Sequence, residues 1–258
     1  MDISRSSPIG VMDSGVGGLT VVRRLRRIMP EENIVFFGDS ANCPYGNRSS
    51  EEVLALSTDM VRFLEDRGAK CIVIACNTMS SLVDALRRRT RLPVVSIVES
   101  AGEYIAARGI ESAGLIATVR TVDSGIYEEC IRDAGSACRI VSRSSPVLAE
   151  LIESGCFDSP VIREEIRTKI GSLLAEEPVD KLILGCTHYP LAEDVFRRLY
   201  PGLELIDPAL AQAEAVKKLL ADAGLLNTGG EGSLSLFCSA GEEHIKSIAE
   251  KVMDLSNR

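Results

Sequence analysis

Two cysteines follow apolar runs of nearly the same sequence, one in each half of the chain. Cys76 lies in the segment CIVIACNT (71–78), and Cys186 lies in the segment KLILGCTH (181–188). A hydroxyl or amide side chain follows each thiol directly. One sulfur of such a pair can remove a proton from carbon while the other returns a proton to the opposite face. The pattern therefore predicts proton-transfer chemistry on both faces of one small carbon centre.

The chain has only two histidines, and one of them stands beside the second thiol. Alternate residues of an extended strand point to the same side, so His188 is expected to face the same way as Cys186 and to act as its proton partner. His244, in the carboxyl-terminal helical segment, is interpreted as structural. Cys43 lies in a polar segment (38–46) and could approach the same site. The cysteine and histidine spacings match no standard zinc pattern, so no metal is expected.

The first apolar run leads into the segment DSGVGG (13–18), which a helical pattern follows. Backbone amides in such a loop, together with the start of a helix, favour an anion, and a carboxylate would suit this loop. It is not a Walker-type nucleotide loop, because no Lys-Ser or Lys-Thr pair follows. A tight strand-to-helix turn remains the alternative interpretation.

Short apolar runs alternate with longer helical patterns along the chain, which predicts an α/β fold. A helix is expected over 18–29, and Ser49 with Glu52 predicts a capping box for a helix that ends near Gly68. The runs are typical of buried parallel strands. They are Ile9–Met12, Ile34–Phe37, Cys71–Ala75, Val94–Val98, Ala113–Ala117, Arg139–Val141, Leu182–Leu184, Leu203–Ile206 and Leu234–Cys238.

The repeated cysteine context predicts two similar lobes, each a mostly parallel sheet flanked by helices. We expect one lobe to comprise 1–98 and 208–258 and the other 99–207. Open parallel sheets bind ligands beyond the carboxyl ends of their strands, where Asp13, Cys76, Thr118 and Cys186 would emerge. The active site is therefore expected in the cleft between the lobes.

Composition excludes several functional classes. The 258 residues are 45% hydrophobic, and no apolar run reaches the ~20 residues of a membrane span. The amino terminus lacks the pattern of a secretory signal, so a cytoplasmic location without disulfides is expected. The net charge of −8 argues against a general nucleic-acid surface. The basic run Arg23–Arg27 is interpreted as the solvated face of a helix.

Four segments together resemble the signature blocks of the glutamate racemases, which belong to the cofactor-independent Asp/Glu racemase superfamily. They are DSGVGGLT (13–20), PYG (44–46), ACNT (75–78) and LGCTHYPL (184–191), in order along nearly the whole chain. The resemblance implies an isomerase that interconverts L- and D-glutamate by two-base, two-cysteine proton transfer without a cofactor. It also implies a role in supplying D-glutamate for peptidoglycan. Homodimers are frequent among such enzymes, so a homodimer is compatible with it.

The resemblance also assigns roles to individual residues. Cys76 and Cys186 match the two catalytic cysteines, while Asp13 and His188 match the groups that tune them. Asp39 and Glu153 match further acidic positions, with weaker support. The positions that hold the amino acid match Asp13, Ser14, Tyr45, Gly46, Asn77, Thr78, Thr118, Thr121, Thr187 and His188.

Some residues depart from the family pattern and leave the substrate open. Asn42 replaces a common arginine, Met79-Ser80 follows Asn77-Thr78 where small residues are usual, and Ser100 and Ser145 replace a proline and a cysteine. Glutamate is favoured, and the alternatives are aspartate or the substrate of another two-thiol isomerase of the superfamily. A third interpretation is a non-catalytic binding or regulatory protein. The intact Asp13, Cys76, Cys186 and His188 argue against that interpretation.

Overall fold

The computed structural model describes residues 3–254 and places nine strands there in two parallel sheets. All nine strands predicted from the sequence are present. The first sheet has the order β4-β3-β1-β2-β9 and the second the order β6-β5-β7-β8. Their bounds are β1 Ile9–Asp13, β2 Ile34–Gly38, β3 Cys71–Ile74, β4 Val94–Ser96, β5 Ser112–Ala117, β6 Arg139–Ser144, β7 Lys181–Gly185, β8 Glu204–Ile206 and β9 Leu234–Cys238.

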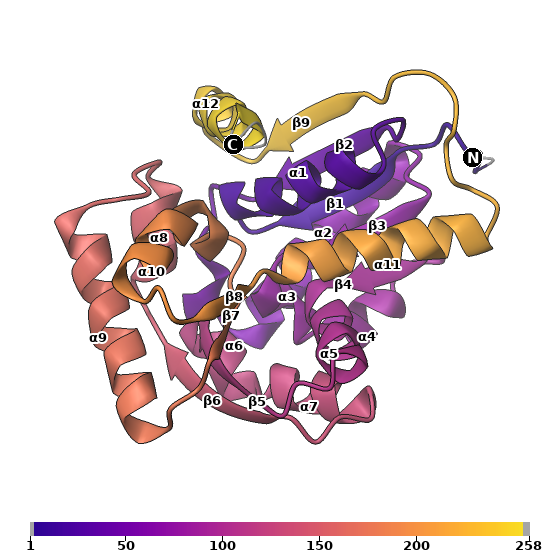
Figure 1. Cartoon of the computed structure of the whole chain (residues 1–258). Helices are drawn as coiled ribbons and strands as arrows, with labels where there is room; N and C mark the ends of the chain where they lie inside the picture. The colour runs from indigo at the N-terminus through magenta and orange to yellow at the C-terminus, as the bar shows by residue number, and fades with distance from the viewer. Residues whose placement is uncertain (1–2, 255–258) are drawn as a thin grey trace.

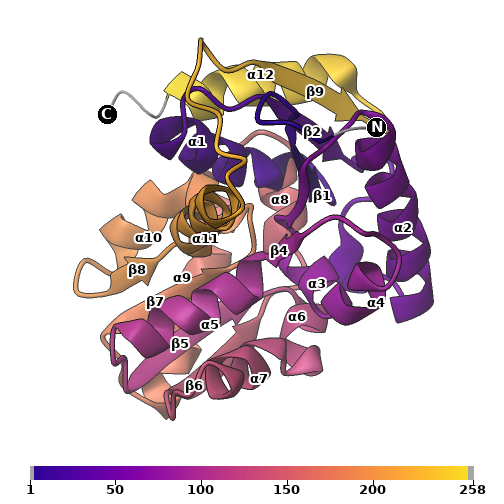
Figure 2. The same ribbon diagram turned by 90° about the vertical axis from the view of Figure 1, so that its right-hand side faces the viewer.

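Helices flank both sheets, so the α/β class is confirmed (Figures 1 and 2). Helix α11 packs against α1 of the first half and against α5, and Figure 2 shows it nearly end-on between them. The α-helices are α1 Leu19–Ile28, α2 Ser50–Asp66, α3 Asn77–Ser80, α4 Val83–Arg87, α5 Ile97–Ala107, α6 Val119–Ser124, α7 Ile126–Asp133, α8 Leu148–Glu153, α9 Pro160–Glu176, α10 Glu193–Leu199, α11 Pro208–Asp222 and α12 Glu242–Asp254; short 3-10 turns are η1 Val16–Gly18, η2 Tyr45–Asn47 and η3 Tyr189–Ala192.

Side-chain caps explain where helix α2 begins and where strand β4 ends. The predicted capping box of α2 is present, because the Ser49 hydroxyl accepts from the Glu52 amide and the Glu52 carboxylate accepts from the Ser49 amide. The strand expected over 94–98 ends early, at Ser96. The Ser96 hydroxyl accepts from the Glu99 amide and starts α5 at Ile97, so the cap takes the last two expected strand residues into a helix.

The chain leaves the first sheet after β4, forms the second sheet, and returns to the first through β9, which pairs with β2 (Figure 1). We propose that the lobes comprise 1–98 with 208–258 and 99–207, as far as the described residues extend. The first boundary then falls within α5, and the second precedes α11. Both helices would connect the lobes.

Strands β1 and β3 are buried along their whole length, and β5 and β7 are buried after their first residue, which explains why they appear as continuous apolar runs in the sequence. The side chains that could take part in chemistry lie at the carboxyl ends of these strands. Asp13 ends β1, Cys76 follows β3, Thr118 follows β5 and Cys186 follows β7. Each sheet therefore contributes one thiol from the end of a central strand.

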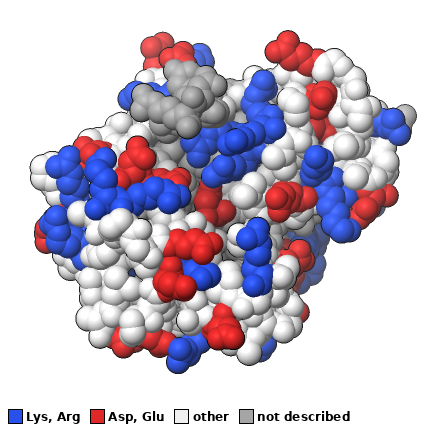
Figure 3. Space-filling model, in the orientation of Figure 1, with Lys and Arg blue, Asp and Glu red and all other residues white. Residues whose placement is uncertain are grey.

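Charged side chains of both signs are interspersed on the face seen in Figure 3. The basic run on α1 is more engaged than expected, because Arg24 pairs with Asp207 at 3.0 Å and Arg26 donates to the Gly232 carbonyl. Only Arg27 of the run is exposed. No described helix is long and apolar enough to cross a membrane.

Candidate active site

Cys76 is a buried thiol between the end of β3 and the start of α3. Its Sγ donates to the Ser14 hydroxyl at 3.6 Å, and its backbone carbonyl accepts from Ser80 Oγ at 3.1 Å. Burial, followed by the nearby Asp13 charge, raises the pKa of Cys76 to about 12, and Cys186 contributes in the same direction. Cys76 is therefore a protonated thiol at neutral pH, and it lies close enough to Cys186 for the two to interact.

Asp13 is fully buried and accepts hydrogen bonds from both halves of the chain. Its Oδ2 accepts from the backbone amides of Gly15 at 3.2 Å and Gly18 at 3.0 Å, and its Oδ1 accepts from Thr187 Oγ1 at 3.2 Å. Burial raises the pKa of Asp13 to about 6, although His188 acts in the opposite direction. Its charge state therefore changes near neutrality.

The glycine loop after β1 holds carboxylates of the protein itself. Asp13 occupies the amides of Gly15 and Gly18, and the amide of Val16 donates to Glu153 at 3.1 Å. The sequence predicted that this loop would favour an anion, and these two side chains fill that role. The amides of Gly15, Val16 and Gly18 are therefore not free for a ligand carboxylate.

His188 connects the second thiol to a carboxylate. Its Nδ1 lies 3.5 Å from Cys186 Sγ, and its Nε2 lies 2.5 Å from Glu153 Oε2. Burial alone would lower the pKa of His188, but hydrogen bonds with Cys186, Cys43 and Glu153 outweigh burial and raise it well above its ordinary value. Burial would raise the pKa of Glu153, but its bond to His188 prevails and lowers it. His188 is thus held as an imidazolium between the Cys186 sulfur and the Glu153 carboxylate.

Gly17 allows the glycine loop to press against this group. A Cβ at Gly17 would lie 2.5 Å from Thr187 Oγ1 and 2.7 Å from His188 Nδ1, which no side chain could occupy without displacing them. The glycine therefore permits a contact between the lobes that positions the imidazole.

Several hydroxyl side chains and one amide side chain lie together after the ends of β3 and β5. Thr78 Oγ1 is 3.1 Å from Thr118 Oγ1, and Thr118 Oγ1 is 3.0 Å from Thr121 Oγ1. Asn77 receives a hydrogen bond from the buried Tyr127 hydroxyl to its Oδ1 at 2.7 Å, while its buried Nδ2 has no partner. An unpaired buried donor is costly, and a ligand oxygen would satisfy it.

Gly46 packs against Thr118 of this group, and Tyr45 and Asp39 lie next to Gly46. The Tyr45 hydroxyl donates to Asp39 Oδ2 at 2.5 Å, and a Cβ at Gly46 would lie 2.8 Å from Thr118 Cβ. Asp39 also accepts from Asn42 and Ser239. The structure therefore places Asp39 in a network behind Tyr45, whereas Glu153 bonds His188 directly.

The residues that depart from the family pattern make local contacts. Asn42 donates to Asp39 at 3.0 Å, and Met79 is fully buried. Ser100 donates to the Ser96 carbonyl at 2.9 Å, and Ser145 accepts from the Leu148 amide at the start of α8. These contacts add no charged group to the site.

The structure adds two residues to those with predicted roles. Tyr127, on α7, orients Asn77, and nothing in its local sequence indicates this role. Cys43 was expected only to approach the site. Its Sγ, an oxygen of Glu153 and a ring nitrogen of His188 lie within 4.8 Å of one another.

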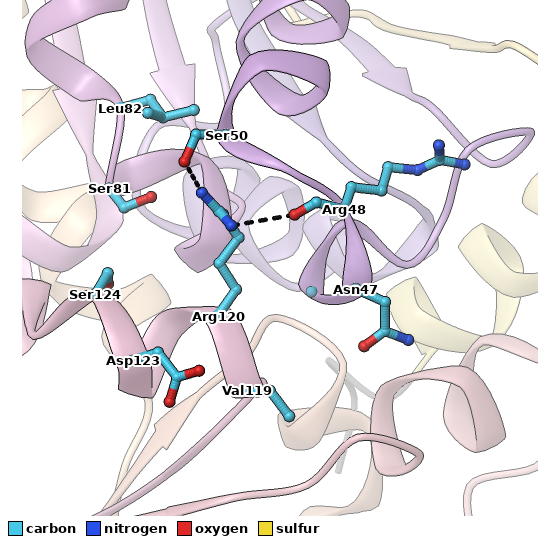
Figure 4. Close-up of a pocket in the computed structure, with 10 residues that line it drawn as sticks. Asn47, Arg48, Ser50, Ser81, Leu82, Val119, Arg120, Asp123 and Ser124 are labelled. Atoms are coloured by element: carbon cyan, nitrogen blue, oxygen red, sulfur yellow. Dashed lines mark hydrogen bonds between the residues drawn. The ribbon is translucent and has the colours of Figure 1, made fainter.

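A cavity of about 580 Å³ is lined by residues in or beside η2, α2, α3 and α6 (Figure 4). It is bordered by Gly46 to Ser50 on one side and by Val119 to Ser124 on the other. The Arg120 guanidinium crosses between them and donates to the Arg48 carbonyl and the Ser50 hydroxyl. Gly46 borders the cavity and packs against Thr118. The cavity therefore lies next to the hydroxyls of Thr78, Thr118 and Thr121.

We expect Glu153→Gln to lower the pKa of His188, because the variant removes the charge that stabilises the imidazolium. An NMR titration of the histidine signals, with a chelator in the buffer, measures this pKa. Because the chain has two histidines, the variant His244→Gln assigns the signals. Because the pKa of His188 is raised in the folded protein, its protonated form stabilises the fold. This contribution is fully present below the unfolded pKa of 6.5 and is lost as pH rises through the folded pKa. An unchanged titration in Glu153→Gln would contradict this assignment.

The chain is similar to known proteins over nearly its whole length. The family model of the Asp/Glu/hydantoin racemases matches residues 9–216. Glutamate racemase 2 of Caldanaerobacter subterraneus subsp. tengcongensis is 36% identical over 96% of this chain and 94% of its own. The structure of glutamate racemase isoform RacE1 from Bacillus anthracis superposes with a TM-score of 0.90 at 33% identity, covering 97% of this chain and 95% of that one. Glutamate racemase of Francisella tularensis in complex with D-glutamate gives 0.88 at 29% identity, covering 97% and 94%. The chain belongs to the Asp/Glu/hydantoin racemase family.

Proposed function

We propose that the protein interconverts L- and D-glutamate by proton transfer between two cysteines. The observation that carries this proposal is the pair of buried thiols, Cys76 and Cys186, which the central strands of two different sheets bring to one site. The glutamate racemases similar to this chain support glutamate as the substrate.

The unequal environments of the thiols suggest how a turnover begins. For one enantiomer, Cys186 beside His188 acts as the base that takes the α-proton and forms an S–H bond. Cys76, whose pKa is about 12, is the thiol that donates its proton to the opposite face of the same carbon. The C–H bond breaks on one side and a new one forms on the other, which inverts the centre. For the other enantiomer the roles exchange: Cys76 gives its proton to Asp13 and becomes the base, while Cys186 takes a proton from His188 and becomes the acid.

Neutral donors would hold the substrate. The unpartnered Nδ2 of Asn77 and the hydroxyls of Thr78, Thr118 and Thr121 can donate to its carboxylates. Ser14, Tyr45, Gly46 and Thr187 surround the same space in our proposal. Preorganised donors in a site closed from water stabilise the negative charge that develops at the α-carbon.

We propose that this chemistry needs no cofactor. Many amino acid racemisations use a pyridoxal Schiff base on a lysine as electron sink. Lys70 is the buried lysine among the described residues, and its Nζ lies 2.5 Å from Glu32 Oε2 and also donates to two backbone carbonyls. It is therefore committed to a structural ion pair away from the thiols.

The family role places the product, D-glutamate, in peptidoglycan synthesis. We propose that the protein works in the cytoplasm, since its eight cysteines are all free, as expected of a reducing compartment. We also propose a homodimer, by analogy with related enzymes, and no nucleic-acid or membrane partner.

The decisive assay offers L-glutamate and, separately, L-aspartate to the purified protein in D₂O without added cofactor. We expect optical inversion of glutamate together with deuterium incorporation at its α-position. Inversion of aspartate alone would assign the protein to the alternative substrate. Absence of exchange with both amino acids would contradict the proposed function.

Tyr127→Phe should raise the KM for glutamate by about tenfold, corresponding to one hydrogen bond of about 1–1.5 kcal/mol. The variant releases the Asn77 amide, whose Nδ2 then no longer faces the substrate. Steady-state kinetics test this expectation, with Tyr104→Phe as the matched control because Tyr104 packs against Arg108 on α5. Equal KM values for Tyr127→Phe and wild type would refute the role of Tyr127.

A further inference from the structure

Three donor atoms of different kinds meet next to the imidazole of His188. They are the Cys43 thiol, a carboxylate oxygen of Glu153 and a ring nitrogen of His188, all within 4.8 Å of one another. Cys43 follows β2, Glu153 ends α8 and His188 follows β7, so the fold of the whole chain brings them together. The two-thiol reaction proposed above does not use Cys43.

This donor set matches the preference of Zn²⁺. Zinc takes sulfur at about 2.3 Å, imidazole nitrogen at about 2.0–2.1 Å and carboxylate oxygen at about 2.0–2.2 Å, in tetrahedral geometry. Neighbouring ligands of such a centre are about 3.5 Å apart, so the three side chains need to move by only about 1 Å. Three protein ligands also leave a fourth position for water.

The glycine loop packs closely against two of the donors, and solvent reaches them. A Cβ at Gly15 would lie 2.6 Å from Glu153 Oε2 and 2.8 Å from Cys43 Sγ, so only glycine lets the loop lie against both donors where they are. Cys43 and Glu153 are half-buried, whereas His188 is buried. An ion arriving from solvent would therefore meet Cys43 and Glu153 first.

We propose that Cys43, Glu153 and His188 form a reversible inhibitory site for a thiophilic divalent cation such as Zn²⁺. The ion is not a cofactor. Binding exchanges the Glu153–His188 hydrogen bond for two metal bonds and adds a third bond to the Cys43 sulfur. The Cys43 thiol and the His188 imidazolium each release one proton. His188, held by the metal, can then no longer supply a proton to Cys186, and racemisation stops.

Cobalt(II) is the probe for the test, because a bound thiolate gives a sulfur-to-cobalt charge-transfer absorption. The full chain, stripped of metal by a chelator, is titrated with Co²⁺ and then with Zn²⁺. We expect one equivalent of Co²⁺ to produce the band and Zn²⁺ to remove it. A wild-type protein without this band would overturn the proposal.

Variants identify the ligands. Cys43→Ala should lose the band and weaken Zn²⁺ inhibition by about tenfold or more, and Glu153→Gln should weaken cobalt binding. Cys156→Ala removes an exposed thiol from the loop after α8 and should behave as wild type. Thermal unfolding of Cys43→Ala checks that the variant folds. An unchanged band in folded Cys43→Ala would overturn the proposal.

The spectroscopic result does not depend on catalysis, so it separates this proposal from the proposed function. If Cys76→Ser, which keeps all three ligands, binds Co²⁺ with the wild-type band, the site excludes the first catalytic thiol, as proposed. Loss of the band in folded Cys76→Ser would instead place the ion between the catalytic thiols and contradict the site.

Discussion

The burial of the Asp13 carboxylate is the constraint on which the site depends. A buried charge needs hydrogen-bond partners, and Asp13 takes them from two loop amides and from Thr187 of the other sheet. These bonds shape the glycine loop and draw the ends of β1 and β7 together. The same charge contributes to the raised pKa of Cys76. One buried carboxylate thus links the geometry of the lobes to the protonation of a thiol.

The two thiols are similar in sequence but differ in electrostatic environment. Cys76 has the Ser14 hydroxyl and the Asp13 carboxyl as neighbours, whereas Cys186 has an imidazolium supported by Glu153. The first environment favours a protonated thiol, and the second places a cation beside the sulfur. A reversible two-base reaction needs this difference, because one sulfur must be able to give a proton while the other can take one.

Much of the fold could be predicted from the sequence, because buried parallel strands are continuous apolar runs. His188 lies beside Cys186 as expected, but β7 ends at Gly185 and His188 has helical backbone, so strand alternation is not the reason. The contacts between distant segments could not be predicted. Tyr127 meets Asn77, and Glu153 meets Val16, only through packing between the sheets. The end of β4 was missed because the Ser96 cap competes with the strand. The loop amides were expected to favour an anion, but the sequence did not show that side chains of the protein would fill them.

The central claim is that two thiols act as one unit on opposite faces of the substrate. It is tested most directly by the rate of glutamate inversion in Cys76→Ser, Cys186→Ser and the double variant, each checked for folding. We predict that each single variant loses activity by on the order of a thousandfold or more and that the double variant loses little further, because residues acting as a unit are not additive. Near wild-type inversion by either folded single variant would contradict the account.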